Sequence, residues 1–323
     1  MLFSDCQTTS KLSVIIPFVS EHPQIAFTVQ ALGAELIHGV RNFEVIVIDN
    51  HCPQVEQQWA EGWKGHEDGG GKYMSEAAGR LPWLKYLNYT DKLSHWQCKN
   101  LGVRESTGDI LLFLDSHVVP SQGTIAGMFL EYAKTWETLH GTMHLPLSYM
   151  LDHNSQLRYK LKTDLSKGII HYAFTHHTPV GYTFRVPAMS TCGMMMHRSI
   201  YDDLGGWPVE LGIYGGGENF MNFCLAVLGY NKWLYSASGP LYHYAAPRSY
   251  HFDYVDFHHN RAIANWCIGG EDLARLYVDS LDCPKWQKED IWTLSSRPSV
   301  ADHAAMIQKK KKKDIKDWLA SWP

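Results

Sequence analysis

Asp115, Ser116 and His117 directly follow an uninterrupted apolar run at residues 110–114. Such a run is typical of a strand that is buried on both faces of a parallel sheet. Ligands bind beyond the carboxyl ends of the strands in such sheets, so we expect this tripeptide to face a crevice. Residues two apart in an extended segment point to the same side, and Asp115 and His117 can therefore reach one cation together. Considered alone, the tripeptide also fits a plain polar junction between a strand and a loop.

The elements that would position this tripeptide alternate between strand and helix. Apolar runs predict strands at residues 12–17, 43–48 and 83–89, and helical apolar spacing predicts helices at residues 25–38 and 93–105. Strands separated by helices indicate an α/β protein with a doubly wound, mostly parallel sheet. No G-x-G-x-x-G segment follows the first strand, which disfavours a nicotinamide oxidoreductase.

Four segments of this half resemble a known family when they are taken together. They read LSVIIP at residues 12–17, EVIVID at 44–49, KNLGV at 99–103 and GDILLFLD at 108–115. Their order and spacing are similar to those of family 2 nucleotide-sugar glycosyltransferases, which share the GT-A fold. The resemblance implies a single Rossmann-like sheet and a C-terminal helical extension.

The same resemblance implies a division of the chain. Residues 1–250 would form the GT-A catalytic domain, with a nucleotide-binding half at 1–120 and an acceptor half at 121–250. Residues 251–323 would form the helical extension. In this arrangement Asp49 contacts the uridine, the helix that carries Asn100 packs beside the nucleotide, and Asp115 serves the metal on the diphosphate. The implied nucleotide-contacting residues are Pro17, Glu21, Asp49, Asn100, Asp115 and Arg248.

The metal motif departs from the usual Asp-x-Asp of these enzymes, because His117 stands at its third position. Asp-x-His is the motif of the polypeptide N-acetylgalactosaminyltransferases, which this part of the chain resembles. In those enzymes a later histidine supplies a third metal ligand, and His243 occupies that place here. One carboxylate and two imidazoles, from Asp115, His117 and His243, suit Mn²⁺ better than Mg²⁺, which prefers oxygen ligands. Zinc remains a rival, since it binds the same side chains.

Glu218 and Asn219 are the candidate catalytic residues. They follow three glycines at 215–217 and open a predicted helix at 218–228, where the resembling enzymes have Gly-Gly-Glu-Asn or Gly-Glu-Asp. The Asn219 amide cannot accept a proton at neutral pH. Either Glu218 is the base, or the reaction retains configuration and the departing diphosphate takes the proton, which we favour. Glu218 also fits a first-turn acid that only the helix dipole stabilises.

Three further stretches of the sequence predict structure or binding. Residues 151–186 have few hydrophobic runs and predict a long, loop-rich insertion or lid. An Ala- and Leu-rich pattern predicts a helix at residues 260–277. Five consecutive lysines begin at Lys309 and end at Lys313. They fit a solvated helix face, or contact with DNA, RNA or another polyanion such as an anionic membrane surface.

Composition limits the class of protein. The 323 residues carry a net charge of −4, which argues against a whole surface built for nucleic acid. The seven cysteines are scattered and form no C-x-x-C pair, so we expect free thiols in a reducing compartment. The first residues do not resemble a signal peptide, and no stretch approaches the ~18 apolar residues of a membrane span. We therefore expect a cytoplasmic protein.

The functional expectation is a metal-dependent glycosyltransferase of the hexosyl or N-acetylhexosaminyl type. It would move a sugar from a UDP-sugar donor to a hydroxyl on a protein, a glycan or a hydroxymethylated base in DNA. The alternative is a catalytically silent nucleotide-sugar or glycan-binding protein on the same fold, because Asn219 could mark lost chemistry.

Overall fold

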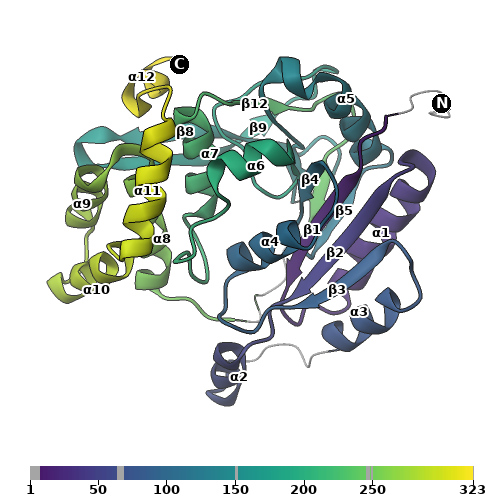
Figure 1. The fold of residues 1–323 in the computed structure, drawn as a ribbon, viewed down its shortest axis with the longest axis horizontal. Helices are drawn as coiled ribbons and strands as arrows, with labels where there is room; N and C mark the ends of the chain where they lie inside the picture. The colour runs from purple at the N-terminus through teal and green to yellow at the C-terminus, as the bar shows by residue number, and fades with distance from the viewer. Residues whose placement is uncertain (1–7, 64–68, 150–151, 245–247, 249, 323) are drawn as a thin grey trace.

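The structure, a computed structural model, describes residues 8–63, 69–149, 152–244, 248 and 250–322 (Figure 1). Its first half alternates strand and helix as predicted, with boundaries that differ by only a few residues. The predicted elements are β1 (Leu12–Phe18), α1 (Gln24–Gly39), β2 (Phe43–Asp49), β3 (Leu84–Asn88), α4 (His95–Arg104) and β4 (Ile110–Phe113). Two short helices, α2 (Pro53–Ala60) and α3 (Gly70–Ala78), connect β2 to β3.

The main sheet has eight strands in the order β10-β12-β6-β11-β4-β1-β2-β3. The strands β4, β1, β2 and β3 run parallel, as do β12 and β6, whereas β11 is antiparallel to both of its neighbours. The predicted α/β class and the large, mostly parallel sheet are therefore confirmed. The added strands are β6 (Gly141–His144), β10 (Phe184–Arg185), β11 (Met194–His197) and β12 (Asn231–Leu234).

Helices cover both faces of this sheet. On β1, Val14 and Ile16 face a layer that contains α1, α3 and α5 (Thr124–Leu139), whereas Ile15 faces the opposite layer. That opposite layer contains α4, α6 (Arg198–Leu204) and α7 (Gly217–Val227). Helices cover both faces of the sheet, so the side chains on both sides of each strand are mostly buried and apolar. Each buried aliphatic side chain stabilises the folded state by about 1.5–3 kcal/mol.

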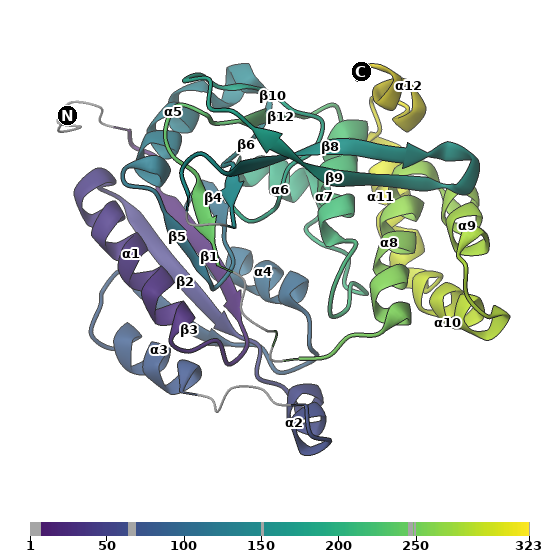
Figure 2. The same ribbon diagram turned by 180° about the vertical axis from the view of Figure 1, so that it is seen from behind.

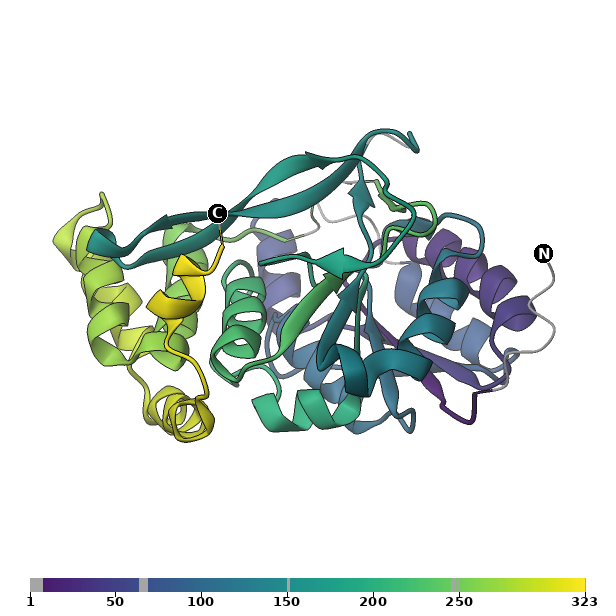
Figure 3. The same cartoon turned by 90° about the horizontal axis from the view of Figure 1, so that it is seen from above.

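A second, five-stranded sheet was not predicted. Its order is β5-β13-β7-β8-β9, formed by β5 (Val118–Pro120), β13 (Leu241–His243), β7 (Leu147–Ser148), β8 (Gln156–Asp164) and β9 (Ile169–His177). The antiparallel strands β8 and β9, joined by the short helix η1 (Leu165–Lys167), form a long hairpin that crosses the molecule above α7 and α8 (Figures 2 and 3).

The prediction of a loop-rich insertion at 151–186 is therefore wrong for the described residues 152–186. Strands β8 and β9 occupy most of that segment. On β8, Leu157, Tyr159 and Leu161 alternate with the charged residues Arg158, Lys160 and Lys162, which is the period of a strand. A half-buried strand of this kind contains no continuous apolar run, and its sequence therefore resembles a loop.

The C-terminal region is helical, as predicted. It contains α8 (Tyr254–Gly269), α9 (Glu271–Ser280), α10 (Lys285–Ser295), α11 (Pro298–Lys310) and α12 (Ile315–Ala320). The single helix predicted at 260–277 is wrong, because Gly270, with a φ of 87°, separates α8 from α9. Phe220 of α7, Ile263 of α8 and Val300 of α11 share one core, which packs this region against the second face of the main sheet. The boundary at residue 250 stays a prediction.

Candidate functional site

A cavity of about 420 Å³ opens at the carboxyl ends of β1 and β4. This volume is in the range of small-molecule sites in proteins. The cavity brings together most of the predicted site residues from both halves of the chain. Those that line it are Pro17, Glu21, Asp115, His117, Glu218, Asn219, His243 and Arg248.

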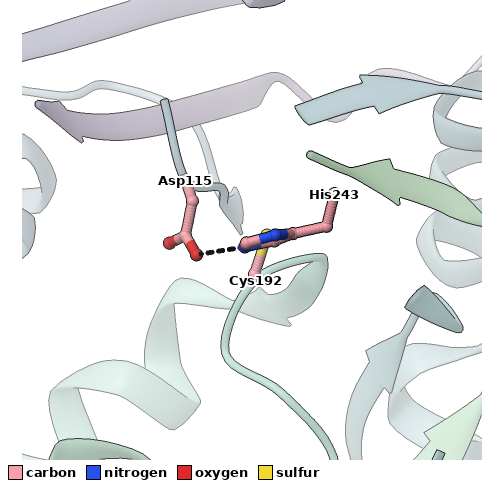
Figure 4. A group of neighbouring side chains, drawn as sticks. All are labelled: Asp115, Cys192 and His243. Atoms are coloured by element: carbon pink, nitrogen blue, oxygen red, sulfur yellow. Dashed lines mark hydrogen bonds and ion pairs between the residues drawn. The ribbon is translucent and has the colours of Figure 1, made fainter. Parts of the chain in front are cut away.

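Asp115 and His243 form the centre of one side of the cavity. Oδ2 of Asp115, just after β4, lies 3.2 Å from Nε2 of His243, at the end of β13 (Figure 4). Nζ of Lys99, a buried side chain of α4, lies 3.9 Å from Oδ1 of the same carboxylate. Burial alone would raise the pKa of Asp115, but the hydrogen bond with His243 and the charge of Lys99 outweigh it and lower that pKa strongly. Asp115 is therefore an ionised carboxylate.

His117 lies beside this pair and is held by Glu21. Its Nδ1 lies 3.1 Å from Oε1 of Glu21, and its ring stands edge-on to that of His243 with centroids 4.6 Å apart. Burial opposes the charged form of His117, but the Glu21 carboxylate prevails and raises the pKa of the imidazole. A carboxylate behind a histidine fixes the orientation of its ring, so Glu21 positions His117. Ser116 also donates a hydrogen bond to Glu21.

Cys192 is a cavity-side residue that the sequence reasoning missed. Among the described residues, single ligand atoms of Asp115, Cys192 and His243 all lie within 4.8 Å of one another (Figure 4). Burial raises the pKa of the Cys192 thiol well above its usual range, with a further contribution from Asp115. Nδ1 of His243 is buried and has no hydrogen-bond partner among the described residues. One carboxylate, two nearby imidazoles and a thiol fit a divalent transition-metal ion.

Glu218 faces the cavity because a glycine turn places the start of α7 there. Gly215 and Gly216 have φ values of 80° and 66°, which glycine adopts without strain. A Cβ atom on Gly217 would lie only 2.3 Å from the ring of Trp96, so only glycine allows the helix to begin so close to α4. The three glycines thus explain why Glu218 stands at the wall of the cavity.

The carboxylate of Glu218 is surrounded by hydrogen-bond donors. Its Oε1 accepts hydrogen bonds of 2.9 Å from the Ser190 hydroxyl and from the Thr191 backbone N–H. Its Oε2 accepts from the hydroxyls of Tyr172 and Tyr159, the latter at 3.3 Å. Both oxygens are therefore engaged, and the tyrosines come from the β8–β9 hairpin.

Asn219 is held against the edge of the same hairpin. Its Nδ2 donates to the Ile170 carbonyl at 2.8 Å and lies 3.3 Å from Nδ1 of His171. Burial and the charge of Arg261 lower the pKa of His171 to about 4, so this imidazole is neutral at physiological pH. The amide of Asn219 thus ties α7 to β9.

Asp49 and Asn100 are the predicted site residues that do not line the cavity. Asp49 ends β2 and accepts hydrogen bonds from the His51 backbone at 3.0 Å and from the Tyr86 hydroxyl at 2.9 Å. Asn100 instead binds both backbone groups of Trp207, through Oδ1 at 3.0 Å and Nδ2 at 2.8 Å. Their contacts with a nucleotide stay predictions.

The lysine run from Lys309 to Lys313 lies away from the cavity. The backbone N–H groups of Lys312 and Lys313 donate to the carbonyl of Val227, the last residue of α7. Glu218, which lines the cavity, is the second residue of the same helix. The helix between them is ~16 Å long. The run and the cavity are therefore at opposite ends of α7.

The sequence reasoning missed several side chains of the cavity. They come from α4, the β8–β9 hairpin and α8, elements that are far apart in the sequence. The alternation of aromatic residues along the hairpin is a local signal for Tyr159 and Tyr172. The missed residues are Lys99, Tyr159, His171, Tyr172 and Arg261.

No protein-family model and no curated protein sequence matches this chain. Solved structures do match. The chain superimposes on GalNAc-T7, crystallised with UDP, GalNAc and Mn²⁺, with a TM-score of 0.71 and 14% identity over 96% of this chain. The chain has a GT-A fold. It spans 56% of the GalNAc-T7 chain, so much of that protein has no counterpart here.

Two further solved structures have the same fold. The S. aureus TarS fragment 1–349 in complex with UDP gives a TM-score of 0.52 at 12% identity, with 95% of this chain and 89% of that chain covered. The mannosyltransferase PcManGT from Pyrobaculum calidifontis, in complex with GDP-Man and Mn²⁺, gives 0.51 at 15% identity, with 98% and 80% covered. Among the described residues, no helix is both long and apolar enough to cross a membrane.

Proposed function

We propose that this chain is a metal-dependent glycosyltransferase that transfers a hexose or N-acetylhexosamine from a UDP-sugar to a hydroxyl. One observation carries the proposal. A single cavity at the carboxyl edge of a GT-A sheet holds the ionised Asp115 with two histidines on one side and Glu218 at a helix start on the other. The first set suits a metal and a diphosphate, and the second suits the reacting sugar and the acceptor.

Asp115, His117 and His243 would hold the metal. Their side chains meet on one wall of the cavity, and the thiol of Cys192 lies beside them. A bound divalent cation stabilises the charge that develops on the departing diphosphate, which is the main barrier in such a transfer. Mn²⁺ suits a mixed set of nitrogen and oxygen ligands, and Mg²⁺ or zinc are the alternatives.

Arg248 and Lys99 would bind the diphosphate of the donor. The Arg248 guanidinium lies over the ring of Tyr214, 4.2 Å from its centroid, and its charge acts on His117 across the cavity. Lys99 is buried beside Asp115. Pro17 lines the cavity at the end of β1 and Asp49 ends the neighbouring β2, an edge of the sheet that suits the uridine.

The surroundings of Glu218 support a reaction that retains the configuration of the donor sugar. Hydrogen bonds occupy both of its carboxylate oxygens, so neither is left to take a proton from an acceptor. Asn219 cannot act as a base because its side chain is an amide. The acceptor proton would therefore leave on the β-phosphate, while Glu218 would hold Tyr159 and Tyr172 at the wall of the cavity.

Among the described residues, five buried cysteines are free thiols, which supports work in a reducing compartment such as the cytoplasm. The acceptor would be a hydroxyl on a protein, a glycan or a hydroxymethylated base in DNA. A polyanion would bind at the lysine run rather than in the cavity, because that run lies at the other end of α7.

The test is to incubate the purified protein with Mn²⁺ and a panel of UDP-sugars and to measure release of UDP. We expect slow hydrolysis of one donor, and faster release once a suitable acceptor is present. No hydrolysis and no transfer with any donor, together with tight binding of UDP, would instead identify a catalytically silent binding protein.

A further inference from the structure

Arg261 is a cation in the cavity that has no counter-ion in the part of the chain that the structure describes. It lies on α8, in the C-terminal helical region, and lines the same cavity as Glu218. Its guanidinium lies over the ring of Phe257, 4.2 Å from the centroid, and one of its nitrogens is 2.9 Å from Nε2 of His171. Among the described residues no carboxylate lies within 4.0 Å of the guanidinium. Its Nε is buried and has no hydrogen-bond partner there.

A partly buried guanidinium without an anion is energetically unfavourable, because it loses hydration and gains no counter-charge. His171 does not compensate for it. That imidazole is neutral, so it accepts a hydrogen bond from Arg261 without neutralising its charge. The hydroxyl of Tyr277, which also hydrogen-bonds to Arg261, is uncharged as well. An anion that binds Arg261 would therefore come from outside the described part of the chain.

This cation is distinct from the one assigned to the donor diphosphate. Arg248 lies over Tyr214, Tyr214 stacks with Phe257 at 6.0 Å between centroids, and Arg261 lies over Phe257. The two arginines thus stand at opposite ends of a row of aromatic rings. The charge of Arg248 acts on His117, beside the metal ligands, whereas the charge of Arg261 acts on Tyr172, which binds Glu218.

Lys162 adds positive charge beside Arg261. It pairs directly with His171 across the β8–β9 hairpin, so both side chains project from the same face. Its charge is one of the causes that keep His171 neutral. Lys162 is exposed, and among the described residues no carboxylate lies within 4.0 Å of it. Two cations without a carboxylate partner among the described residues therefore flank His171.

We propose that Arg261, with Lys162 at its side, binds a carboxylate or phosphate group of the acceptor, so the acceptor is an acidic hydroxyl compound. The inference rests on the proposed transfer reaction, since it names the class of its second substrate. Arg261 would hold the anionic group while the acceptor hydroxyl lies near Glu218. Arg261 takes no part in bond making or breaking and is a specificity residue.

The test uses the full chain with its donor site filled by Mn²⁺ and UDP. Glucuronate, glucose 6-phosphate and glucose are titrated in turn by calorimetry. We expect at least one of the two acids to bind at least ~10-fold more tightly than glucose. Glucose has no charged group to bond with Arg261, and the absence of one charged hydrogen bond typically lowers affinity by about this factor. The two acids distinguish a carboxylate from a phosphate.

Arg261→Gln should reduce the affinity for the acids to that for glucose, and Arg261→Lys should retain part of it. Arg275→Gln is the matched control, because Arg275 also lies over an aromatic ring, that of Trp292, but does not line the cavity. Equal binding of all three compounds by the parent would overturn the inference, and so would an equal loss in both glutamine variants. If Arg261→Gln does not fold, the comparison of acids with glucose in the parent and in Arg261→Lys decides.

If the proposed transferase function is wrong, the titrations give a different result from the one expected if only the anion site is wrong. A parent protein that does not bind Mn²⁺ and UDP would contradict the proposed transferase function. The same acids titrated into the protein alone would then still report on the anion site at Arg261. Absence of acid binding with and without UDP would overturn the anion site by itself.

Discussion

At the scale of single residues, the proposed metal site consists of Asp115 and the two histidines beside it. We expect Asp115→Asn, His117→Ala and His243→Ala each to lose Mn²⁺-dependent binding of UDP, because each removes a proposed ligand. Loss of one ligand typically lowers metal affinity far more than the 10- to 100-fold seen for the residues that orient ligands. Calorimetric titration of UDP with and without Mn²⁺ measures the effect, and the exposed Asp302→Asn is the control.

The third metal ligand is decided by comparing His117→Ala with Cys192→Ser. Burial keeps the Cys192 thiol protonated, and a protonated thiol is a poor ligand, so we expect Cys192→Ser to bind Mn²⁺ and UDP like the parent. If Cys192→Ser loses the metal and His117→Ala keeps it, the thiolate is the ligand. Zinc would then replace manganese as the preferred ion.

In the proposed retaining reaction Glu218 holds the tyrosines of the cavity wall and does not deprotonate the acceptor, so its removal should have a limited effect on turnover. We expect Glu218→Gln to raise KM for the donor and to lower kcat by less than the ~10²–10⁴-fold typical of a lost general base. Asn219→Asp should not raise activity, because Nδ2 of Asn219 is needed for its bond to the Ile170 carbonyl.

Proton NMR of the first-formed product provides the independent measurement for Glu218. The product should keep the anomeric configuration of the donor sugar. An inverted product, together with an inactive Glu218→Gln enzyme, would make Glu218 the base and end the retaining hypothesis.

At the scale of elements, the β8–β9 hairpin is fixed at its tip as well as at its base. Gly168, in the left-handed region with a φ of 64°, packs against α9 so closely that a Cβ atom would lie 2.8 Å from the Tyr277 nitrogen. Nδ2 of Asn265 on α8 donates to the Gly168 carbonyl at 2.9 Å. The hairpin that carries Tyr159 and Tyr172 to Glu218 is thus held by the C-terminal helices.

Gly168→Ala tests this attachment, and Gly181→Ala is its matched control. Gly181 has a φ of 75°, but no atom lies within 4 Å of the Cβ position. Both substitutions introduce left-handed strain of about 1–2 kcal/mol. Gly168→Ala should cost a further ~1–3 kcal/mol for the clash with α9. Urea unfolding measures both variants, and equal losses would mean that the tip is not held by α9.

At the scale of the whole molecule, buried neutral histidines should make the protein sensitive to acid. Burial lowers the pKa of His144 to about 3, and its ring bonds the Ser190 carbonyl at 3.0 Å and the Thr142 hydroxyl at 2.8 Å. The pKa is lower in the folded chain than in the unfolded chain, so the unfolded chain binds more protons at mildly acidic pH. The stability that this ring contributes is therefore complete above about pH 6.5 and is lost as the pH falls toward 3.

The expected loss from His144 is about 2 kcal/mol between pH 6.5 and pH 5, from 1.36 kcal/mol per pH unit for one proton. His144→Asn should be less stable at pH 7, but its unfolding free energy should fall less between pH 7 and pH 5 than that of the parent. The exposed His38→Asn is the control. An unchanged pH dependence in His144→Asn would mean that other groups govern acid unfolding.

The sequence by itself determined the alternating half of the fold and one wall of the site. Short apolar runs predict the strands β1, β2 and β4, which are buried on both faces of the sheet. Asp115 follows shortly after β4 in the sequence. The glycines before Glu218 mark a backbone that only glycine adopts, so the start of α7 was also readable. These features depend on neighbours in the chain, which is why local patterns contain them.

Only the tertiary structure decided which distant side chains join Asp115 and Glu218. Lys99 and Arg261 line the cavity, and Cys192 lies beside Asp115, because α4, α8 and the segment before β11 converge there. No spacing in the sequence records that convergence. The hairpin is half-buried, so its apolar residues alternate with polar ones and a search for apolar runs overlooks it. Which distant side chains meet is set by the packing of α8 on α7 and of β9 on α8, and this packing exists only in the folded chain.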